Sequence, residues 1–202
     1  RFSGRASELR FDSSVVLDHE PSGAGDLRLD EHAAVWPFSY GPEEGPDLGR
    51  SIERQFADPE REVDRWARGF LRQGGPTDTL ELLTGMTHAV RRGFAYIARH
   101  DGGTQEPRRT LRLGSGTCRD FAVLMLEAVR SLGLAARFVS GYLYSPGRDD
   151  GSGHVGGGAT HAWVRVYLPG AGWVEFDPTN GIVGNRDLIR VAVRSEEHTS
   201  EL

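Results

Sequence analysis

The chain has one cysteine, Cys118, and its position favours nucleophilic chemistry. It begins a segment whose apolar residues recur at helical spacing, and the first N–H groups of a helix lack helical acceptors. These N–H groups and the helix dipole favour the thiolate, which is the nucleophilic form of cysteine. Gly114 and Gly116 just before it would let a substrate chain approach closely. A buried structural cysteine is the alternative, because free cysteines are often buried.

A base and an orienting acid follow the cysteine in sequence. His161 opens a predicted strand, and Asp177 directly follows the strand predicted at 173–176. The two strands form a predicted hairpin, and a register with Trp163 opposite Asp177 would make His161 and Asp177 diagonal neighbours on one face. Each residue alone could be structural, as a hydrogen-bonded histidine and a turn-forming aspartate. Together with the thiol they predict a catalytic triad of Cys118, His161 and Asp177.

Other residues near this triad are weaker candidates. Trp163 shares a strand face with His161, and Tyr142 lies on the neighbouring strand, so we predict both as substrate-binding residues, with ordinary packing as the alternative. Asp120, in the first turn of the helix, is expected to be structural. We predict no metal and no cofactor. A zinc site is a weaker alternative that would use Cys118, His154, His161 and Asp177.

Amphipathic patterns indicate the elements that position these residues. A helix is predicted from Asp58-Pro59 to the glycines at 74–75, and a second, capped by Thr77 or Asp78, continues to Ile97. Residues 101–117 are predicted as a polar loop, followed by the cysteine helix, which Thr117 or Ser115 can cap and which Gly133 ends. Strands are predicted at 137–144, 161–168 and 173–177, and the glycine-rich loop 145–160 should be mobile and border the site.

Composition narrows the classes of protein that the chain can represent. It has 202 residues, 38% of them hydrophobic and 26% charged, which excludes wholesale disorder. The net charge of −5 and the absence of a basic stripe argue against nucleic acid as a partner. No apolar run approaches the roughly 18–20 residues that span a bilayer. One cysteine excludes an internal disulfide and suits a reducing compartment, so we predict the cytoplasm.

Three segments are predicted along the chain. Residues 1–58 contain short apolar runs broken by proline and glycine clusters, which indicate two or three weak strands. Residues 59–193 form the predicted catalytic core. Residues 194–202 read RSEEHTSEL, which resembles the translation of a sequencing adapter, and we exclude them from the fold. Because the chain starts with Arg1, we expect its true start to be missing, which leaves export open.

Four motifs in order carry a resemblance to a known family. They are GSGTCRDFA at 114–122, SGYLY at 140–144, THAW at 160–163 and EFDPTNG at 175–181. Together they resemble the bacterial transglutaminase-like cysteine peptidase family. The resemblance implies an α+β, papain-like fold, in which a central helix carrying Cys118 packs on an antiparallel sheet carrying His161 and Asp177. It also implies a β-rich N-terminal region over 1–58, and a chain that is cut at Val193.

The predicted function is thiol-dependent acyl transfer on a peptide or protein substrate. His161 would take the proton of Cys118, Asp177 would fix the tautomer, and the thiolate would attack an amide carbonyl to form a thioester. Water then gives hydrolysis, which we favour, and an amine gives transamidation. A module that kept the fold but lost the chemistry is the alternative from another class. The backbone N–H of Cys118 is one predicted hydrogen-bond donor to the oxyanion. The sequence identifies neither a second donor nor the oligomeric state.

Overall fold

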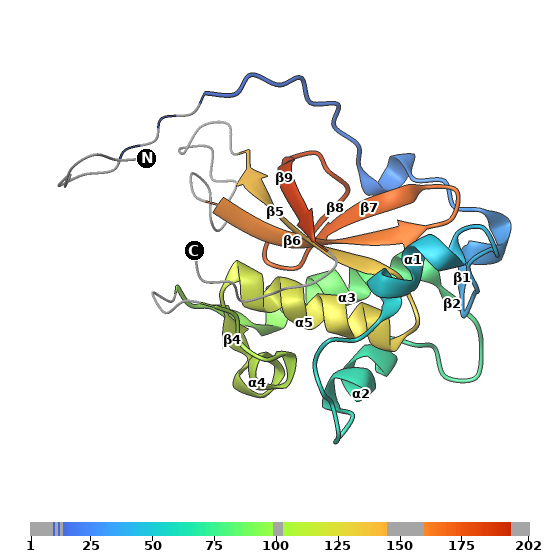
Figure 1. The fold of residues 1–202 in the computed structure, drawn as a ribbon. Helices are drawn as coiled ribbons and strands as arrows, with labels where there is room; N and C mark the ends of the chain where they lie inside the picture. Colours follow the sequence, from blue (N-terminus) through green and yellow to red (C-terminus); the bar gives the residue numbers. More distant parts are fainter. Residues whose placement is uncertain (1–9, 11, 13, 99–102, 145–159, 195–202) are drawn as a thin grey trace.

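The computed structural model describes residues 10, 12, 14–98, 103–144 and 160–194, which form an α+β fold (Figure 1). A five-stranded sheet lies on one side, and helices cover one of its faces. The predicted loop 145–160 and tail 194–202 lie outside the described residues, except for Thr160 and Arg194. No helix in the described ranges is long and apolar enough to cross a membrane.

The sheet is antiparallel throughout, with strand order β8-β7-β6-β5-β9. Gly170 and Gly172 adopt positive φ angles in the turn between β6 and β7, as a tight hairpin turn requires. The register pairs Val164 with Phe176; continued by one residue, it sets Trp163 opposite Asp177, which is the register that puts His161 and Asp177 on one face. The strand bounds are β5 Ala136–Leu143, β6 Thr160–Leu168, β7 Gly172–Asp177, β8 Ile182–Val183 and β9 Leu188–Arg194.

Helix α5, Cys118–Ser131, is the buried centre of the fold. Thr117 caps its start, and Gly133 lies just past its end with φ 81°, so both predicted ends are confirmed. Leu124 and Met125 of α5 and Val164 of β6 are each 0% exposed within one apolar core. The predicted α+β arrangement of a cysteine-bearing helix on an antiparallel sheet is therefore confirmed.

The two helices predicted before it are present with different bounds. Helix α3 spans Thr79–Gly93 and is capped by Asp78, whose side chain accepts a hydrogen bond from the Glu81 N–H. It ends four residues before the predicted end at Ile97. Helix α2 spans only Glu62–Arg68, because Asp58 uses its carboxylate to accept the N–H groups of Glu62 and Asp64 and so begins the helix later.

We predicted a polar loop over residues 101–117, but the described part of this segment is not a simple loop. It contains helix α4, Pro107–Leu113, which begins at a proline and ends at Gly114 with φ 58°. The helix escaped prediction because it is short and carries few apolar residues. After it, strand β4, Ser115–Gly116, pairs in parallel with β3, Ala95–Tyr96.

The described part of residues 1–58 is less β-rich than predicted. It contains one strand, β1 at Val35–Trp36, which pairs with β2 at Thr77–Asp78. Two 3-10 helices, η1 at Ala24–Asp26 and η2 at Glu31–Ala33, precede the strand, and helix α1 at Gly45–Ile52 follows it. Pro46, from one of the proline and glycine clusters of 1–58, lies in the first turn of α1.

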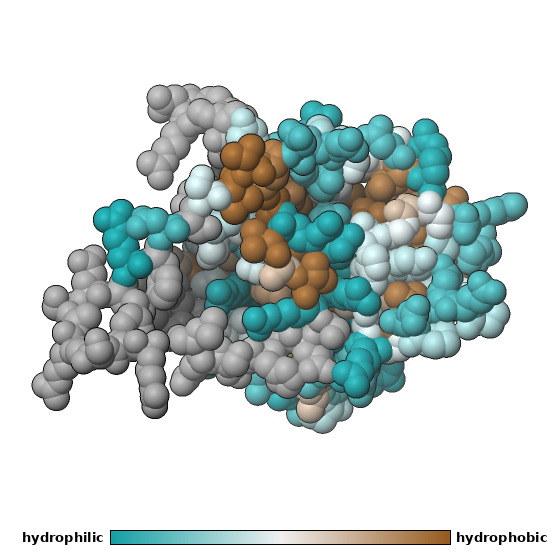
Figure 2. Space-filling view, turned by 45° about the horizontal axis from the view of Figure 1, so that its top comes forward, coloured by the Kyte–Doolittle hydropathy of each residue, from teal (hydrophilic) through white to brown (hydrophobic). Residues whose placement is uncertain are grey.

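The face shown in Figure 2 is mostly hydrophilic, but apolar side chains gather in one part of it. Three large exposed apolar residues come from the neighbouring strands β5 and β9. They are Tyr142 at 50%, Val191 at 65% and Val193 at 36% exposure. Among the described residues β9 forms one edge of the sheet, so this edge presents apolar side chains to its surroundings.

Candidate active site

Cys118 is the first residue of α5, and a capping box fixes its backbone. The Thr117 hydroxyl accepts the Asp120 N–H at 3.4 Å, and Asp120 Oδ2 accepts the Thr117 N–H at 2.7 Å. The Cys118 N–H has no acceptor within the helix, because it belongs to the first turn. The thiol is partly exposed, so a substrate could reach it.

Asp120 anchors the strand that leads into Cys118, which agrees with its predicted structural role. Its side chain is 0% exposed and accepts the Gln105 N–H at 2.7 Å and a Gln105 Nε2 hydrogen at 3.2 Å. Gly116 is needed here for close approach, because an added Cβ would lie 2.8 Å from the Asp120 Cβ. The buried Asp120 carboxylate therefore holds the segment before the thiol, and Gly116 in that segment allows the close contact.

His161 and Asp177 meet inside the protein. His161 Nε2 lies 2.8 Å from Asp177 Oδ2, and the two residues are 1% and 0% exposed. Asp177 Oδ1 accepts the N–H groups of Thr179 at 2.8 Å and Asn180 at 3.3 Å. The Asn180 amide donates to Asp177 Oδ2 at 2.8 Å and lies 3.4 Å from His161 Nε2. This turn fixes the carboxylate against the ring.

The ring of His161 also interacts with Cys118. Burial lowers the pKa of His161, but the hydrogen bond to the Asp177 carboxylate and the proximity of the Cys118 thiol outweigh this effect and raise the pKa from 6.5 to about 10. Because Nε2 is committed to Asp177, Nδ1 is the nitrogen left for the thiol. Nδ1 has no partner of standard hydrogen-bond geometry among the described residues. Such loose contacts are common in sites without substrate.

Trp163, which we predicted as a substrate-binding residue with ordinary packing as the alternative, lies beneath His161 in the protein interior. It is 0% exposed, and its ring stacks on His161 with centroids 6.1 Å apart. Gly141, opposite His161 in the sheet, makes room for it, because an added Cβ would lie 2.6 Å from the Trp163 ring. Trp163 therefore supports the ring of His161 from inside the protein.

Tyr142 lies in a different position from Trp163. It pairs with Thr160, so strand alternation directs its side chain to the face opposite that of Trp163. Its side chain is half exposed. Its contact with substrate stays a prediction.

Three residues near the site were missed at the level of sequence. Asn180 holds Asp177, Gly141 admits Trp163, and Gln105 binds Asp120. The position of Asn180 three residues after Asp177, in a turn, was the one local signal available. Gly141 and Gln105 contact residues distant in sequence, so no local pattern marks them.

The zinc alternative gains no support from the described residues. Within the ranges that the structure covers, no group of three or more histidine, cysteine, aspartate or glutamate side chains could hold a metal ion. His154, its fourth proposed ligand, lies outside those ranges.

Residues 65–178 match the model of the transglutaminase-like superfamily. This span contains Cys118, His161 and Asp177.

Several curated bacterial proteins are similar to parts of the chain. Protein ML0607 of Mycobacterium leprae is 42% identical over 78 residues, which cover 39% of this chain and 27% of that protein. Protein Mb2599c of Mycobacterium bovis is 34% identical over 108 residues, which cover 50% of this chain and 33% of that protein. The chain thus spans a third or less of the length of these relatives.

Solved structures share the fold. A candidate cysteine protease from Cytophaga hutchinsonii aligns with a TM-score of 0.58 at 21% identity, over 74% of this chain and 47% of that one. The periplasmic domain of TgpA from Pseudomonas aeruginosa, bound to ethylmercury, aligns with a TM-score of 0.51 at 25% identity, over 71% of this chain and 51% of that one. The match to the first structure extends the fold assignment beyond the 65–178 segment.

Proposed function

The chain belongs to the transglutaminase-like superfamily, and on that premise we propose that it catalyses thiol-dependent acyl transfer, with Cys118 as nucleophile. The observation that carries the proposal is the position of His161 between two partners. Its Nε2 lies 2.8 Å from Asp177 Oδ2, and Asp177 and the nearby Cys118 both raise its pKa. A thiol, a base and an orienting acid are the parts that nucleophilic catalysis requires.

The first step forms a thioester. His161 holds the proton that leaves Cys118, and the thiolate attacks the carbonyl carbon of an amide. The electron pair of the carbonyl moves onto its oxygen, and the Cys118 N–H can donate to that oxyanion. When the oxyanion collapses, the C–N bond breaks and the leaving amine takes the proton from His161. Asp177 stabilises the imidazolium throughout.

The second step releases the acyl group. A water molecule gives its proton to His161 and attacks the thioester carbonyl, after which the C–S bond breaks and the thiolate returns. An amine in place of water would give transamidation. We favour hydrolysis as the simpler outcome, with peptides or glutamine-type amides as the proposed substrates.

A screen of peptide substrates, with and without an amine donor, tests the proposal. Wild type should form an acyl-enzyme that is stable to acid quench and cleaved by hydroxylamine, and Cys118→Ala should form none. Hydrolysed product supports peptidase or amidase activity, whereas amine-linked product supports transamidation. Turnover that persists in Cys118→Ala would exclude the thiol mechanism. Peptide binding without turnover would favour the non-catalytic module.

The compartment and the segment boundaries also remain proposals. We propose the cytoplasm, because a single thiol suits a reducing environment; the similar TgpA domain is periplasmic. Cell fractionation with an antibody against the chain tests this, and recovery in a periplasmic fraction would contradict it. We propose 59–193 as the catalytic core and 1–58 as its N-terminal region.

A further inference from the structure

Tyr96 is held beside the segment that leads into Cys118, although the two residues are distant in sequence. Tyr96 pairs with Gly116, two residues before the nucleophile. The Ile97 N–H donates to the Gly116 carbonyl at 2.9 Å, and the Ala95 N–H donates to the Gly114 carbonyl at 2.8 Å. These backbone bonds fix the Cα of Tyr96 relative to the start of α5.

A second contact fixes the ring of Tyr96. Its centroid lies 6.5 Å from that of Phe121, with an interplanar angle of 70°. Phe121 follows Cys118 by three residues on α5, so their side chains are neighbours on the helix surface. Phe94 holds the other side of this cluster, 5.8 Å from Phe121. Tyr96 remains 39% exposed, so its ring is fixed on one side and accessible on another.

The electrostatic surroundings of the phenol agree with this placement. Burial, followed by the negative charges of Cys118 and Asp120, raises the pKa of Tyr96. A negative charge on the Cys118 sulfur therefore acts on the Tyr96 phenol. A raised pKa also keeps the hydroxyl protonated, so that it can donate a hydrogen bond.

We propose that the Tyr96 hydroxyl is the second oxyanion donor of the site, together with the backbone N–H of Cys118. The inference rests on the proposed acyl transfer. When the thiolate adds to the carbonyl carbon, the C–S bond forms and the π electrons move to oxygen, which then accepts hydrogen bonds from both donors. When the C–N bond breaks, these electrons return to the carbonyl, and Tyr96 keeps its proton throughout.

Three other donors near the site, among the described residues, are less suitable because they are already bonded or buried. Both Nε2 hydrogens of Gln105 are used, by the Ser115 carbonyl at 3.1 Å and by Asp120 Oδ2 at 3.2 Å. The Asn180 amide donates to Asp177 on the Nε2 side of His161, away from the nitrogen left for the thiol. The Trp163 side chain is fully buried. Tyr96 combines a fixed position, partial exposure and a donor.

Tyr96→Phe tests the proposal, because it keeps the ring on Phe121 and removes only the hydroxyl. Two reactions of Cys118 should be compared: acyl transfer from a p-nitrophenyl ester or peptide, and alkylation by iodoacetamide. Alkylation passes through no oxyanion. We expect kcat/KM for acyl transfer to fall roughly 10²–10³-fold, the loss typical of one oxyanion donor, and the alkylation rate to stay unchanged. Since Cys118 is the one cysteine, alkylation reports on it alone.

Tyr144→Phe is the matched control, because Tyr144 is 55% exposed on the same molecule. It should leave both rates unchanged. Wild-type acyl transfer retained in Tyr96→Phe would overturn the oxyanion role. An equal fall in acyl transfer and alkylation would also overturn it, since it would show that Tyr96 positions the thiol. If wild type alkylates but transfers no acyl group from any substrate, the proposed function itself fails, and the Tyr96 role falls with it.

Discussion

At the scale of single residues, the two oxygens of Asp177 have different partners. Oδ1 accepts backbone N–H groups from Thr179 and Asn180, and Oδ2 faces His161 Nε2. A backbone N–H group can donate a hydrogen bond but cannot accept one. An amide at this position must therefore keep its oxygen toward the backbone and turn its NH2 toward the ring.

This asymmetry predicts the effect of Asp177→Asn. The new NH2 would donate to His161 Nε2, which forces the neutral ring to carry its proton on Nδ1, facing Cys118. The ring could then no longer accept the thiol proton, and we expect kcat to fall by about 10³–10⁴-fold with the fold retained. Steady-state kinetics and circular dichroism check this. Asp12→Asn, at an exposed carboxylate, should change neither; near-normal activity of Asp177→Asn would remove Asp177 from the mechanism.

The raised pKa of His161 predicts a pH dependence. Because its pKa lies at about 10 in the folded protein and 6.5 ordinarily, the charged ring contributes stability that is full below about pH 6.5 and is lost as the pH rises through about 10. The imidazolium needed for the leaving amine should disappear over the same upper range, so activity should decline near pH 10.

Cys118→Ala tests the cause of this shift. The thiol is one of the groups that raise the pKa of His161, so the variant should titrate His161 below about 10, with Asp177 still raising it. NMR titration of the histidine side chains in wild type and variant measures this. An unchanged titration of His161 would contradict the Cys118–His161 contact.

At the scale of elements, the N-terminal cap of α5 connects folding to chemistry. Thr117 and Asp120 exchange hydrogen bonds across the first turn, and Cys118 lies between them. Loss of the cap would fray the turn that carries the thiol.

We therefore predict that Thr117→Ala lowers the free energy of unfolding by about 1 kcal/mol, the usual value of a helix cap. It should also slow alkylation of Cys118, because a frayed turn no longer directs N–H groups at the sulfur. Thr117→Ser keeps the hydroxyl and should restore both quantities. Urea unfolding and iodoacetamide kinetics provide the measurements. A stable but slowly alkylated Thr117→Ala would show that the hydroxyl acts on the thiol directly.

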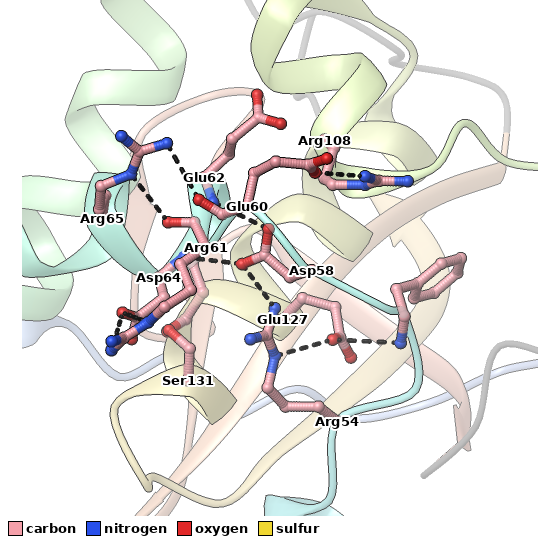
Figure 3. Close-up of polar contacts among 12 residues, drawn as sticks. Arg54, Asp58, Glu60, Arg61, Glu62, Asp64, Arg65, Arg108, Glu127 and Ser131 are labelled. Atoms are coloured by element: carbon pink, nitrogen blue, oxygen red, sulfur yellow. Dashed lines mark hydrogen bonds and ion pairs between the residues drawn. The ribbon is translucent and has the colours of Figure 1, made fainter.

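At the scale of the whole molecule, buried charges connect the segment after α1 to α5 (Figure 3). Glu127 is 0% exposed and accepts the Gln55 N–H at 3.1 Å and the Phe56 N–H at 3.4 Å, with Arg54 Nε at 3.4 Å. One turn later, Arg130 donates to the carbonyls of Ser51, Glu53 and Ala136 at 2.9–3.0 Å. Two charged side chains of α5 thus hold the backbone of 51–56 against the core.

This network predicts a large effect for Glu127→Ala. The variant would remove the buried acceptor of the Gln55 and Phe56 N–H groups and leave the buried Arg130 without its nearby carboxylate, so the free energy of unfolding should fall by about 3–5 kcal/mol. Glu106→Ala, which breaks an exposed pair with Arg108, should cost less than about 1 kcal/mol. Chemical denaturation compares the two. Equal small losses would show that water replaces the carboxylate in the network.

The sequence by itself determined the elements whose pattern is local. The helix of Cys118, its cap at Thr117 and its end at Gly133 follow from apolar spacing and capping chemistry within a few residues. The hairpin of 161–177 follows in the same way, because its turn is short. Side-chain alternation made a shared face for His161 and Asp177 depend on the register of that hairpin, which the structure supplied.

Only the tertiary structure decided the features that depend on distant contacts. It buried Trp163 beneath His161, which Gly141 on another strand allows, whereas strand alternation alone left packing and substrate contact equally open. It paired Tyr96 with Gly116 through backbone hydrogen bonds, and it brought the Asp120 carboxylate to the N–H and Nε2 of Gln105. The physical reason is that burial and non-local pairing depend on which surfaces meet after the chain folds. The periodicity within one segment does not indicate which distant segment it will contact.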